Sequence, residues 1–235
     1  MLPQLVEGIE TLCTNDTRIK CLVESRKEEI IKLLSRYIKE IELFNSAYGL
    51  VGTSDTEQIV IRHILDCLAP LGIISGLLEK HTGTTPHIAD FGSGAGLPGI
   101  PLAIAMPNCN FTLIERMGRR SGFLQNTSAV LSSCTQNGFS NITVEEGEYE
   151  KTEKEKFSIV TFRALANIDK KNIKYLFNAC ITNGFIAAYK GKLDKIKQEM
   201  QILEKTNNCW EAVPYTVPFL DEERHLLVIK NSGNI

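Results

Sequence analysis

Several patterns that mark common enzyme and binding classes are missing from this chain. Its seven cysteines never form a C-x-x-C pair, and its four histidines form no H-x-x-H or H-E-x-x-H pair. Neither a disulfide framework nor a metal site therefore has the spacing it needs, and no metal is predicted. The sequence also lacks a G-K-[ST] phosphate loop, and none of its six tyrosines is followed four residues later by a lysine. These absences are evidence against a P-loop protein and against a common class of nicotinamide-dependent oxidoreductase.

Membrane and export signals are missing too. We expect no membrane span, because no apolar run approaches the roughly 18–20 residues needed. Glu7 and Glu10 interrupt the apolar N-terminus, which argues against a signal peptide and for a cytoplasmic location. The net charge is −2, so a polyanionic partner must be held by a local basic patch. With 235 residues, 43% of them hydrophobic, the chain suits one large domain, or one domain with an added helical part.

Helical periodicity dominates the first part of the chain. Apolar residues recur at helical spacing over residues 24–44, which predicts an amphipathic helix packed on the rest of the molecule. A shorter helix is predicted near residues 3–13, and residues 53–55 can cap a further helix. His63 and Asp66 lie three residues apart on that helix. They either line a ligand pocket or form an ordinary surface pair.

After Pro86 the pattern changes to alternating strands and helices. Strands are predicted at 88–91, 111–115, 142–145, 158–162, 185–189, 212–217 and 225–230, and helices at 100–105, 119–134, 170–180 and 193–205. Residues 218–224 are expected to join the last two strands. Alternation of this kind implies βαβ units and a mainly parallel sheet. We predict an α/β fold with an N-terminal helical extension over residues 1–75 and a sheet domain over 76–235.

The stretch Asp90–Pro101, DFGSGAGLPGIP, has the features of a strand, a tight loop and a helix. Glycine suits a backbone that turns sharply or approaches a ligand closely. Pro98 and Pro101 suit the first turn of a helix. That helix N-terminus offers free N–H groups and the positive end of the helix dipole. The stretch therefore predicts a nucleotide-like ligand.

Two acidic residues help to choose between possible ligands. The dinucleotide pattern G-x-G-x-x-G is satisfied over residues 94–99, but this signal is weak alone. Asp90 stands at the end of the first strand, where a carboxylate can orient the loop and accept bonds from an ammonium group. Glu115 ends the second strand, where an acid pairs with ribose hydroxyls. Adenosine with a charged amino-acid tail fits these groups better than a pyrophosphate, so S-adenosyl-L-methionine is favoured over a nicotinamide cofactor.

The same stretch, 90–101, resembles the signature of the bacterial ribosomal RNA small-subunit methyltransferase G family, also called glucose-inhibited division protein B. Further matches follow in the family's order: Asn45–Leu50, Arg62–Asp66, Leu113–Arg120 with Phe123-Leu124, Arg163–Ala166, Lys190-Gly191 and Glu223–His225. The resemblance implies a class I S-adenosylmethionine-dependent methyltransferase with a Rossmann-like, mainly parallel seven-stranded sheet and an N-terminal helical extension. It implies methylation of the N7 of a guanine in 16S ribosomal RNA. The alternative is a non-catalytic S-adenosylmethionine-sensing or ribosome-assembly binding protein.

Two segments depart from the family's usual pattern. Gly49-Leu50-Val51 stands where the family usually has Asn-Leu-Thr, which removes two polar side chains from the expected pocket rim. Gly147-Glu148-Tyr149-Glu150 stands where the family usually has Gly-Arg-Ala-Glu, so Glu148 replaces an arginine. Contacts to adenine from this segment can use backbone groups and so survive the change.

The expected chemistry needs positioning more than proton transfer. Guanine N7 is a ring lone pair with no proton to remove, so we expect an in-line approach and no general base. Arg163 is the expected positioning residue, because its guanidinium suits the methionine carboxylate or an RNA phosphate. The alternative is a surface arginine that ends a strand.

The expected site residues fall into three groups. The residues expected at the cofactor are Asp90, Gly92, Ser93, Gly94, Gly96, Leu97, Glu115, Arg116, Glu148, Tyr149 and Arg163. The residues expected at the pocket rim are Asn45, Tyr48, His63 and Asp66. The residues expected to bind RNA are Arg119, Arg120, Lys190, Lys192 and Arg224. Several of the RNA group follow strand ends, where ligands bind in open α/β sheets, although a solvated helix face is the alternative for the lysines. The expected partner is 16S ribosomal RNA or the small ribosomal subunit, bound by a monomer.

Overall fold

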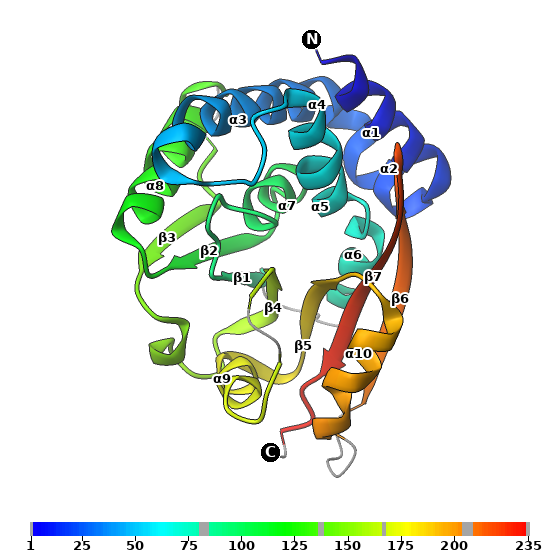
Figure 1. Cartoon of the computed structure of the whole chain (residues 1–235), viewed down its shortest axis with the longest axis vertical. Helices are drawn as coiled ribbons and strands as arrows, with labels where there is room; N and C mark the ends of the chain where they lie inside the picture. The colour runs from blue at the N-terminus through cyan, green and yellow to red at the C-terminus, as the bar shows by residue number, and fades with distance from the viewer. Residues whose placement is uncertain (1, 80–84, 136–138, 166–167, 204–208, 234–235) are drawn as a thin grey trace.

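The computed structural model describes residues 2–79, 85–135, 139–165, 168–203 and 209–233, and the fold is given for these residues. Helices fill the first third of the chain and cover one side of a twisted sheet (Figure 1). Their bounds are α1 Pro3–Asn15, α2 Thr17–Val23, α3 Lys27–Tyr48, α4 Thr56–Ile59, α5 Asp66–Leu68 and α6 Leu71–Leu78. A π-helical segment, Val60–Leu65, joins α4 to α5.

The helix ends follow the local sequence. Gly49 ends α3 with a φ of +58°, the left-handed conformation that favours glycine at a helix C-terminus. The Asp55 side chain accepts the Gln58 N–H at 2.9 Å and caps α4, as the sequence predicted. The predicted helix over 24–44 is confirmed as α3, after a short 3₁₀ turn at Glu24–Arg26. The predictions above did not include α2 or α6.

The sheet has seven strands in the order β3-β2-β1-β4-β5-β7-β6. The bounds are β1 His87–Phe91, β2 Asn110–Glu115, β3 Ile142–Glu146, β4 Phe157–Arg163, β5 Cys180–Lys190, β6 Trp210–Val217 and β7 Leu220–Lys230. Strands β1 to β5 pair in parallel, whereas β7 runs antiparallel to both β5 and β6. All seven predicted strands are present, and the mainly parallel sheet is confirmed.

One predicted connection is wrong. Residues 218–224 were expected to join the last two strands, but β7 already begins at Leu220. Val217 pairs with Leu220, and Phe219 between them has a φ of +66°. The connection is therefore a tight hairpin turn, and the charged run after it continues the strand.

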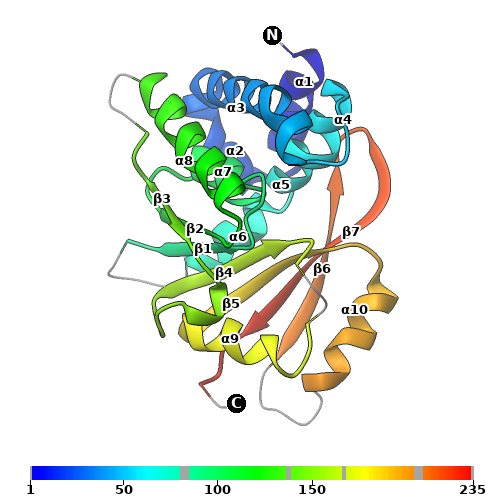
Figure 2. The same ribbon diagram turned by 60° about the vertical axis from the view of Figure 1, so that its left-hand side comes forward.

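The remaining helices place two layers around the sheet. They are α7 Gly99–Ala105, α8 Gly118–Ser133, α9 Asn172–Ala179 and α10 Leu193–Met200. In Figure 2, α9 and α10 lie on one side of the sheet and α3, α7 and α8 on the other. Successive strand side chains point to opposite faces, so Ile159 packs with the N-terminal helices and Val160 with α9 and α10. Burial of both faces explains the nearly continuous apolar runs of β1 and β4.

One helical stretch corrects an expectation from the sequence. Thr56–Leu78 is long and apolar enough to cross a membrane by length and composition, so the expectation that no run approaches this length is wrong. In the fold, 72% of its most apolar window is buried, and its residues join one hydrophobic core with α1, α3 and the sheet. The stretch therefore serves as a core helix in this structure. The domain boundary at residue 75 stays a prediction.

Candidate functional site

The loop between β1 and α7 is shaped by three left-handed glycines. Gly92, Gly94 and Gly96 have φ values of +66°, +56° and +89°, which other residues rarely adopt. A Cβ on Gly96 would lie 2.4 Å from the Ile100 side chain, whereas one on Gly94 would meet nothing closer than 3.8 Å. Gly96 is needed for packing, while Gly94 keeps open space beside the loop.

Asp90 anchors this loop from the core. It is fully buried, and its Oδ2 accepts the Gly99 N–H at 3.0 Å. Burial raises the pKa of Asp90 from 3.8 to about 7, and the Gly99 hydrogen bond opposes that shift. Its Oδ1 is buried without a partner among the described residues. A buried acceptor without a partner is costly, so a ligand N–H donor or a water would be stabilised at Oδ1.

Glu115 at the end of β2 holds the same loop from a second side. Its Oε2 accepts the Gly94 N–H at 2.9 Å, and its Oε1 accepts the Met117 N–H at 2.8 Å. Each carboxylate oxygen can accept more than one hydrogen bond. Both oxygens therefore keep capacity for hydroxyl groups of a ligand.

The N-terminal helices provide a further attachment that sequence reasoning missed. The fully buried Tyr37 of α3 donates its O–H to the Ala95 carbonyl at 2.6 Å. In the sequence, Tyr37 is only one member of the apolar stripe of residues 24–44. No signal there distinguishes it from neighbours that serve packing alone.

A cleft of about 380 Å³ lies beside the loop at the carboxyl ends of β1, β2 and β3; it is called the cofactor cleft below. Five predicted cofactor residues line it: Gly92, Glu115, Arg116, Glu148 and Tyr149. The Tyr149 ring stacks on Phe91 with centroids 5.3 Å apart, which adds an aromatic surface to the cleft. Its volume lies in the range of small-molecule sites, roughly 300–1,000 Å³. A wider hollow of about 570 Å³ shares Arg116 and Glu148 but does not reach the glycine loop.

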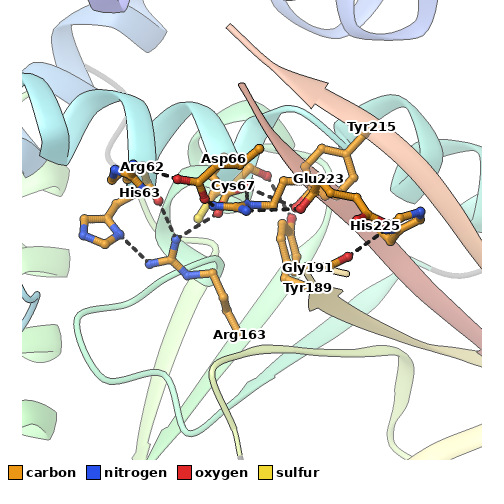
Figure 3. A network of polar contacts seen from close by, with 12 residues as sticks. Arg62, His63, Asp66, Cys67, Arg163, Tyr189, Gly191, Tyr215, Glu223 and His225 are labelled. Carbon is orange, nitrogen blue, oxygen red and sulfur yellow. Dashed lines mark hydrogen bonds and ion pairs between the residues drawn. The ribbon is translucent and has the colours of Figure 1, made fainter. Parts of the chain in front are cut away.

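Other predicted cofactor residues do not line this cleft. Ser93 and Leu97 are buried, Leu97 within the hydrophobic core, so both shape the loop. Arg163 extends from the end of β4 toward the helix that carries His63 and Asp66 (Figure 3). Its guanidinium donates to the Arg62 carbonyl at 3.1 Å and contacts Asp66 Oδ2 at 3.4 Å. With its side chain 17% exposed, Arg163 is not an ordinary surface arginine.

Asp66 is the centre of a polar group in which several separate segments of the chain meet. Its Oδ1 accepts the Tyr215 O–H at 3.1 Å and lies 3.3 Å from Arg224 Nε. Together with Arg163 and His63 these residues form the Asp66 cluster (Figure 3). Two arginines therefore share one buried aspartate, and Arg224 also contacts Glu222 at 3.0 Å.

His63 is held neutral in this cluster. Burial, followed by the nearby charges of Arg163 and Arg62, lowers the pKa of His63 from 6.5 to about 4. Its Nδ1 lies 3.0 Å from Arg163 Nη2. Because a guanidinium can only donate, Nδ1 accepts and Nε2 carries the proton. The sequence left open whether His63 and Asp66 face a ligand or the surface, and the structure directs both toward Arg163.

The predicted RNA-binding residues differ in whether their side chains already have partners within the protein. Lys190 forms an ion pair with Glu199 at 2.7 Å, and Arg224 belongs to the Asp66 cluster. Arg120 donates to the Gly49 carbonyl at 2.9 Å. Arg119 and Lys192 are exposed and have no ion pair within the described residues.

The two remaining rim residues support local structure. Asn45 donates to the Thr53 carbonyl at 2.7 Å and accepts the Val51 N–H at 2.8 Å. Tyr48 stacks on Phe44 with ring centroids 5.5 Å apart. Neither lines the cofactor cleft, and Asn45 fixes the loop that follows α3.

The strand order, the antiparallel β7, the glycine loop after β1 and the acid ending β2 define a class I S-adenosylmethionine-dependent methyltransferase. A methyltransferase from Pyrococcus furiosus has a similar fold, with a TM-score of 0.52, 14% identity and coverage of 84% of this chain and 97% of that one. A putative S-adenosyl-L-methionine-dependent methyltransferase from Methanococcus maripaludis gives a TM-score of 0.51 at 10% identity, covering 81% and 90%. Likeness at these identities supports the fold alone.

The chain belongs to the rRNA small subunit methyltransferase G family, whose model matches residues 30–227. It is 33% identical to the ribosomal RNA small subunit methyltransferase G of Treponema denticola over 96% of this chain and 93% of that protein. It is 34% identical to the Shewanella frigidimarina protein of the same name over 84% and 88%. The resemblance drawn from residues 90–101 is thereby confirmed.

The cofactor is S-adenosyl-L-methionine, and the residues in and beside the cleft fit it. Glu115 keeps acceptor capacity for ribose hydroxyls. Asp90 Oδ1 is a buried acceptor for N–H donors. Gly94 leaves open space where a side chain would intrude. The assignment of individual residues to parts of the cofactor stays a prediction.

Proposed function

We propose that this protein transfers a methyl group from S-adenosyl-L-methionine to the N7 of a guanine in 16S ribosomal RNA. The observation that carries the proposal is the family match over residues 30–227. The cofactor cleft supports it, because its acidic and glycine residues stand at the strand ends where open α/β sheets bind ligands.

The reaction needs alignment and no proton removal. S-adenosyl-L-methionine supplies a methyl group on a positively charged sulfur. The N7 lone pair forms the new N–C bond, and the electron pair of the breaking S–C bond stays on sulfur. The positive charge passes to the purine, so no base has to accept a proton. Catalysis then rests on holding N7 in line with the methyl group.

Arg163 supports this alignment as a positioning residue. Its guanidinium is fixed by Asp66, His63 and the Arg62 carbonyl. The next two residues, Ala164 and Leu165, line the cofactor cleft. Arg163 therefore ties the wall of the cleft after β4 to the N-terminal helices.

RNA phosphates are expected at the exposed arginines beside the cleft. Arg116 and Arg119 are both exposed, on the segment from the end of β2 into α8. Removing Arg119 and Arg120 together should weaken RNA affinity and flatten its salt dependence, because each phosphate contact releases counterions. A loss of cofactor affinity with unchanged RNA affinity would show that this face serves the cofactor instead.

A methylation assay tests the proposed reaction directly. The protein is incubated with radiolabelled S-adenosyl-L-methionine and undermethylated 16S RNA or small subunits. Incorporation at a single guanine N7 is expected. Tight cofactor and particle binding with no incorporation would overturn the enzyme and favour the non-catalytic alternative.

We further propose that the protein acts as a monomer in the cytoplasm, where ribosomal subunits are its substrate. Sedimentation velocity across a wide concentration range should give one species of about 26 kDa. A concentration-independent dimer, or recovery of the protein with membranes, would contradict this proposal.

A further inference from the structure

A second cavity adjoins the cofactor cleft. It has a volume of about 340 Å³ and lies between the ends of β4 and β5 and helix α10. Ala164 and Leu165 line both this cavity and the cofactor cleft. A flat molecule seated in the cavity would therefore have one edge directed across these two residues toward the cofactor.

The walls of this cavity combine apolar surface with one ion pair and with two further lysines, Lys192 and Lys195. Phe162, Leu165 and Ile196 supply the apolar part. Lys190 Nζ lies 2.7 Å from Glu199 Oε2, with the two side chains 13% and 14% exposed. Lys190 Nζ is also 5.9 Å from the centre of the Phe162 ring. Within the described part of the chain, Glu199 Oε1 accepts no hydrogen bond, so an acceptor remains available at the cavity wall.

We propose that this cavity holds the target guanine and that Glu199 and Lys190 recognise it. The proposal rests on the proposed function above. Guanine presents two neighbouring donors, N1–H and the 2-amino group, next to the O6 acceptor. The Glu199 carboxylate accepts from the donors, and the Lys190 ammonium donates to O6. Phe162 and Leu165 cover the faces of the base, as apolar side chains do for bases taken out of a stack.

This arrangement leaves the reactive atom free and rejects the other purine. N7 lies on the edge of the ring away from N1 and the 2-amino group, so it remains available for methylation. Adenine carries a lone pair at N1, which would face the Glu199 carboxylate and be repelled. The purine gains positive charge during the reaction, so the carboxylate also stabilises the product side of the step.

A base analogue combined with one conservative variant tests the pocket. Inosine keeps N7, N1–H and O6 but lacks the 2-amino group. Small-subunit RNA with guanosine or inosine at the methylated position is assayed for kcat/KM with the wild-type protein and with Glu199→Gln. We expect the wild-type protein to prefer guanosine by about tenfold or more, because its carboxylate loses a partner with inosine. We expect Glu199→Gln to reduce that preference to less than about threefold.

A control variant and a binding assay separate the outcomes. Asp194→Asn, an exposed change in the first turn of the same helix, should keep the wild-type preference. If Glu199→Gln lowers kcat/KM equally for the guanosine and the inosine RNA, the proposal is overturned. Glu199 would then serve only as the ion-pair partner of Lys190. Affinity for the two RNAs is also measured with S-adenosylhomocysteine, which needs no methyl transfer. If the wild-type protein methylates neither RNA, the proposed function fails, while equal affinities for both RNAs would still overturn the pocket.

Discussion

The cofactor cleft and the Asp66 cluster both bring acidic side chains to the side of the sheet where the parallel strands end. The two regions differ in whether the carboxylate oxygens have hydrogen-bond partners within the protein. Glu115 at the cleft wall and Asp90, buried beneath the glycine loop, accept backbone N–H groups and keep acceptor capacity for a ligand. In the cluster, both carboxylate oxygens of Asp66 already have partners within the protein, namely Arg163, Arg224 and Tyr215. The first arrangement suits binding, because its open acceptors need donors from outside. The second suits the joining of segments, because its charges already compensate one another.

The largest effect is expected from breaking the cluster. Asp66→Ala leaves two largely buried arginines without their shared counter-charge and Tyr215 without its acceptor. Removing one partner of a buried ion pair typically costs about 3–5 kcal/mol, and Glu222 still compensates Arg224 in part. We therefore expect a loss of about 3 kcal/mol in the free energy of unfolding, measured by urea denaturation. Glu57→Ala, an exposed acid in α4, should change it by less than about 0.5 kcal/mol. A loss below about 1 kcal/mol for Asp66→Ala would show that the cluster does not hold the segments together.

The next effect concerns the cleft and leaves the cluster intact. Gly94→Val fills open space beside the loop at a φ of +56°, and cofactor affinity should fall at least about tenfold, or 1.4 kcal/mol. Gly49→Val is a matched control, because Gly49 has a φ of +58° and an added Cβ there would meet nothing within 4 Å, while one on Gly94 would meet nothing closer than 3.8 Å. Both variants carry the same kind of backbone strain. Calorimetric titration should show weaker cofactor binding for Gly94→Val than for Gly49→Val. Equal affinities for the two variants would show that Gly94 is not part of the cofactor site.

Two buried groups link stability to pH, and they act with opposite signs: Asp90 beneath the glycine loop and His63 in the Asp66 cluster, whose lowered pKa of about 4 gives stability that is lost as the pH falls from about 6.5 to 4. Asp90 has a pKa of about 7 in the folded protein, above its ordinary 3.8, so the folded state binds the proton more tightly. The stability linked to this proton is fully present below about pH 4 and is lost as the pH rises through about 7. A cationic ligand group favours the ionised carboxylate, so cofactor affinity should rise between pH 6 and 8. Asp90→Asn should remove the Asp90 contribution, so that the stability of the variant relative to the wild-type protein rises as the pH increases from 4 to 7, as followed by denaturation of both proteins at each pH. A difference in stability between the two proteins that does not change with pH would show that Asp90 does not bind this proton.

The smallest effect is expected from changing either of two buried tyrosines that donate to backbone carbonyls. Tyr37 donates to Ala95 in the glycine loop at 2.6 Å, and Tyr189 donates to Cys67, next to the cluster, at 2.8 Å. Changing either to Phe should cost about 1 kcal/mol of stability, the usual net value of one such bond. Only Tyr37→Phe should also weaken cofactor binding, by a few-fold, because it loosens the loop. Equal cofactor affinities for the two variants would show that the loop does not depend on α3.

The sequence predicted the cleft better than the cluster for a physical reason. Asp90 and the three loop glycines lie within seven residues of one another, so a strand, a tight turn and a helix can be deduced from local preferences. The Asp66 cluster draws on residues separated by up to 161 positions, from His63 to Arg224. Only the folded sheet brings them together, and nothing in their local patterns indicates a shared partner.

The same limit explains which assignments changed. Arg163, Lys190 and Arg224 were selected from the sequence as ligand-binding cations, because basic residues at strand ends suit anions. Whether a cation is already neutralised depends on distant acids such as Asp66 and Glu199. The alternating strands and helices, by contrast, follow from periodicity alone, and the sheet was predicted almost completely.

The hydrogen bond from Tyr37 to the glycine loop, together with the shared core, has a consequence for how this chain can be divided. A shortened chain beginning at β1 would keep α7 and α8 on this face of the sheet but would expose to water the core that they and the sheet share with the N-terminal helices, and it would leave the Ala95 carbonyl without its donor. The helices before β1 are thus a wall of the catalytic unit. Exchanging them for the leading segment of another methyltransferase would require matching changes on the sheet face and in the loop, so the two parts are constrained to evolve together.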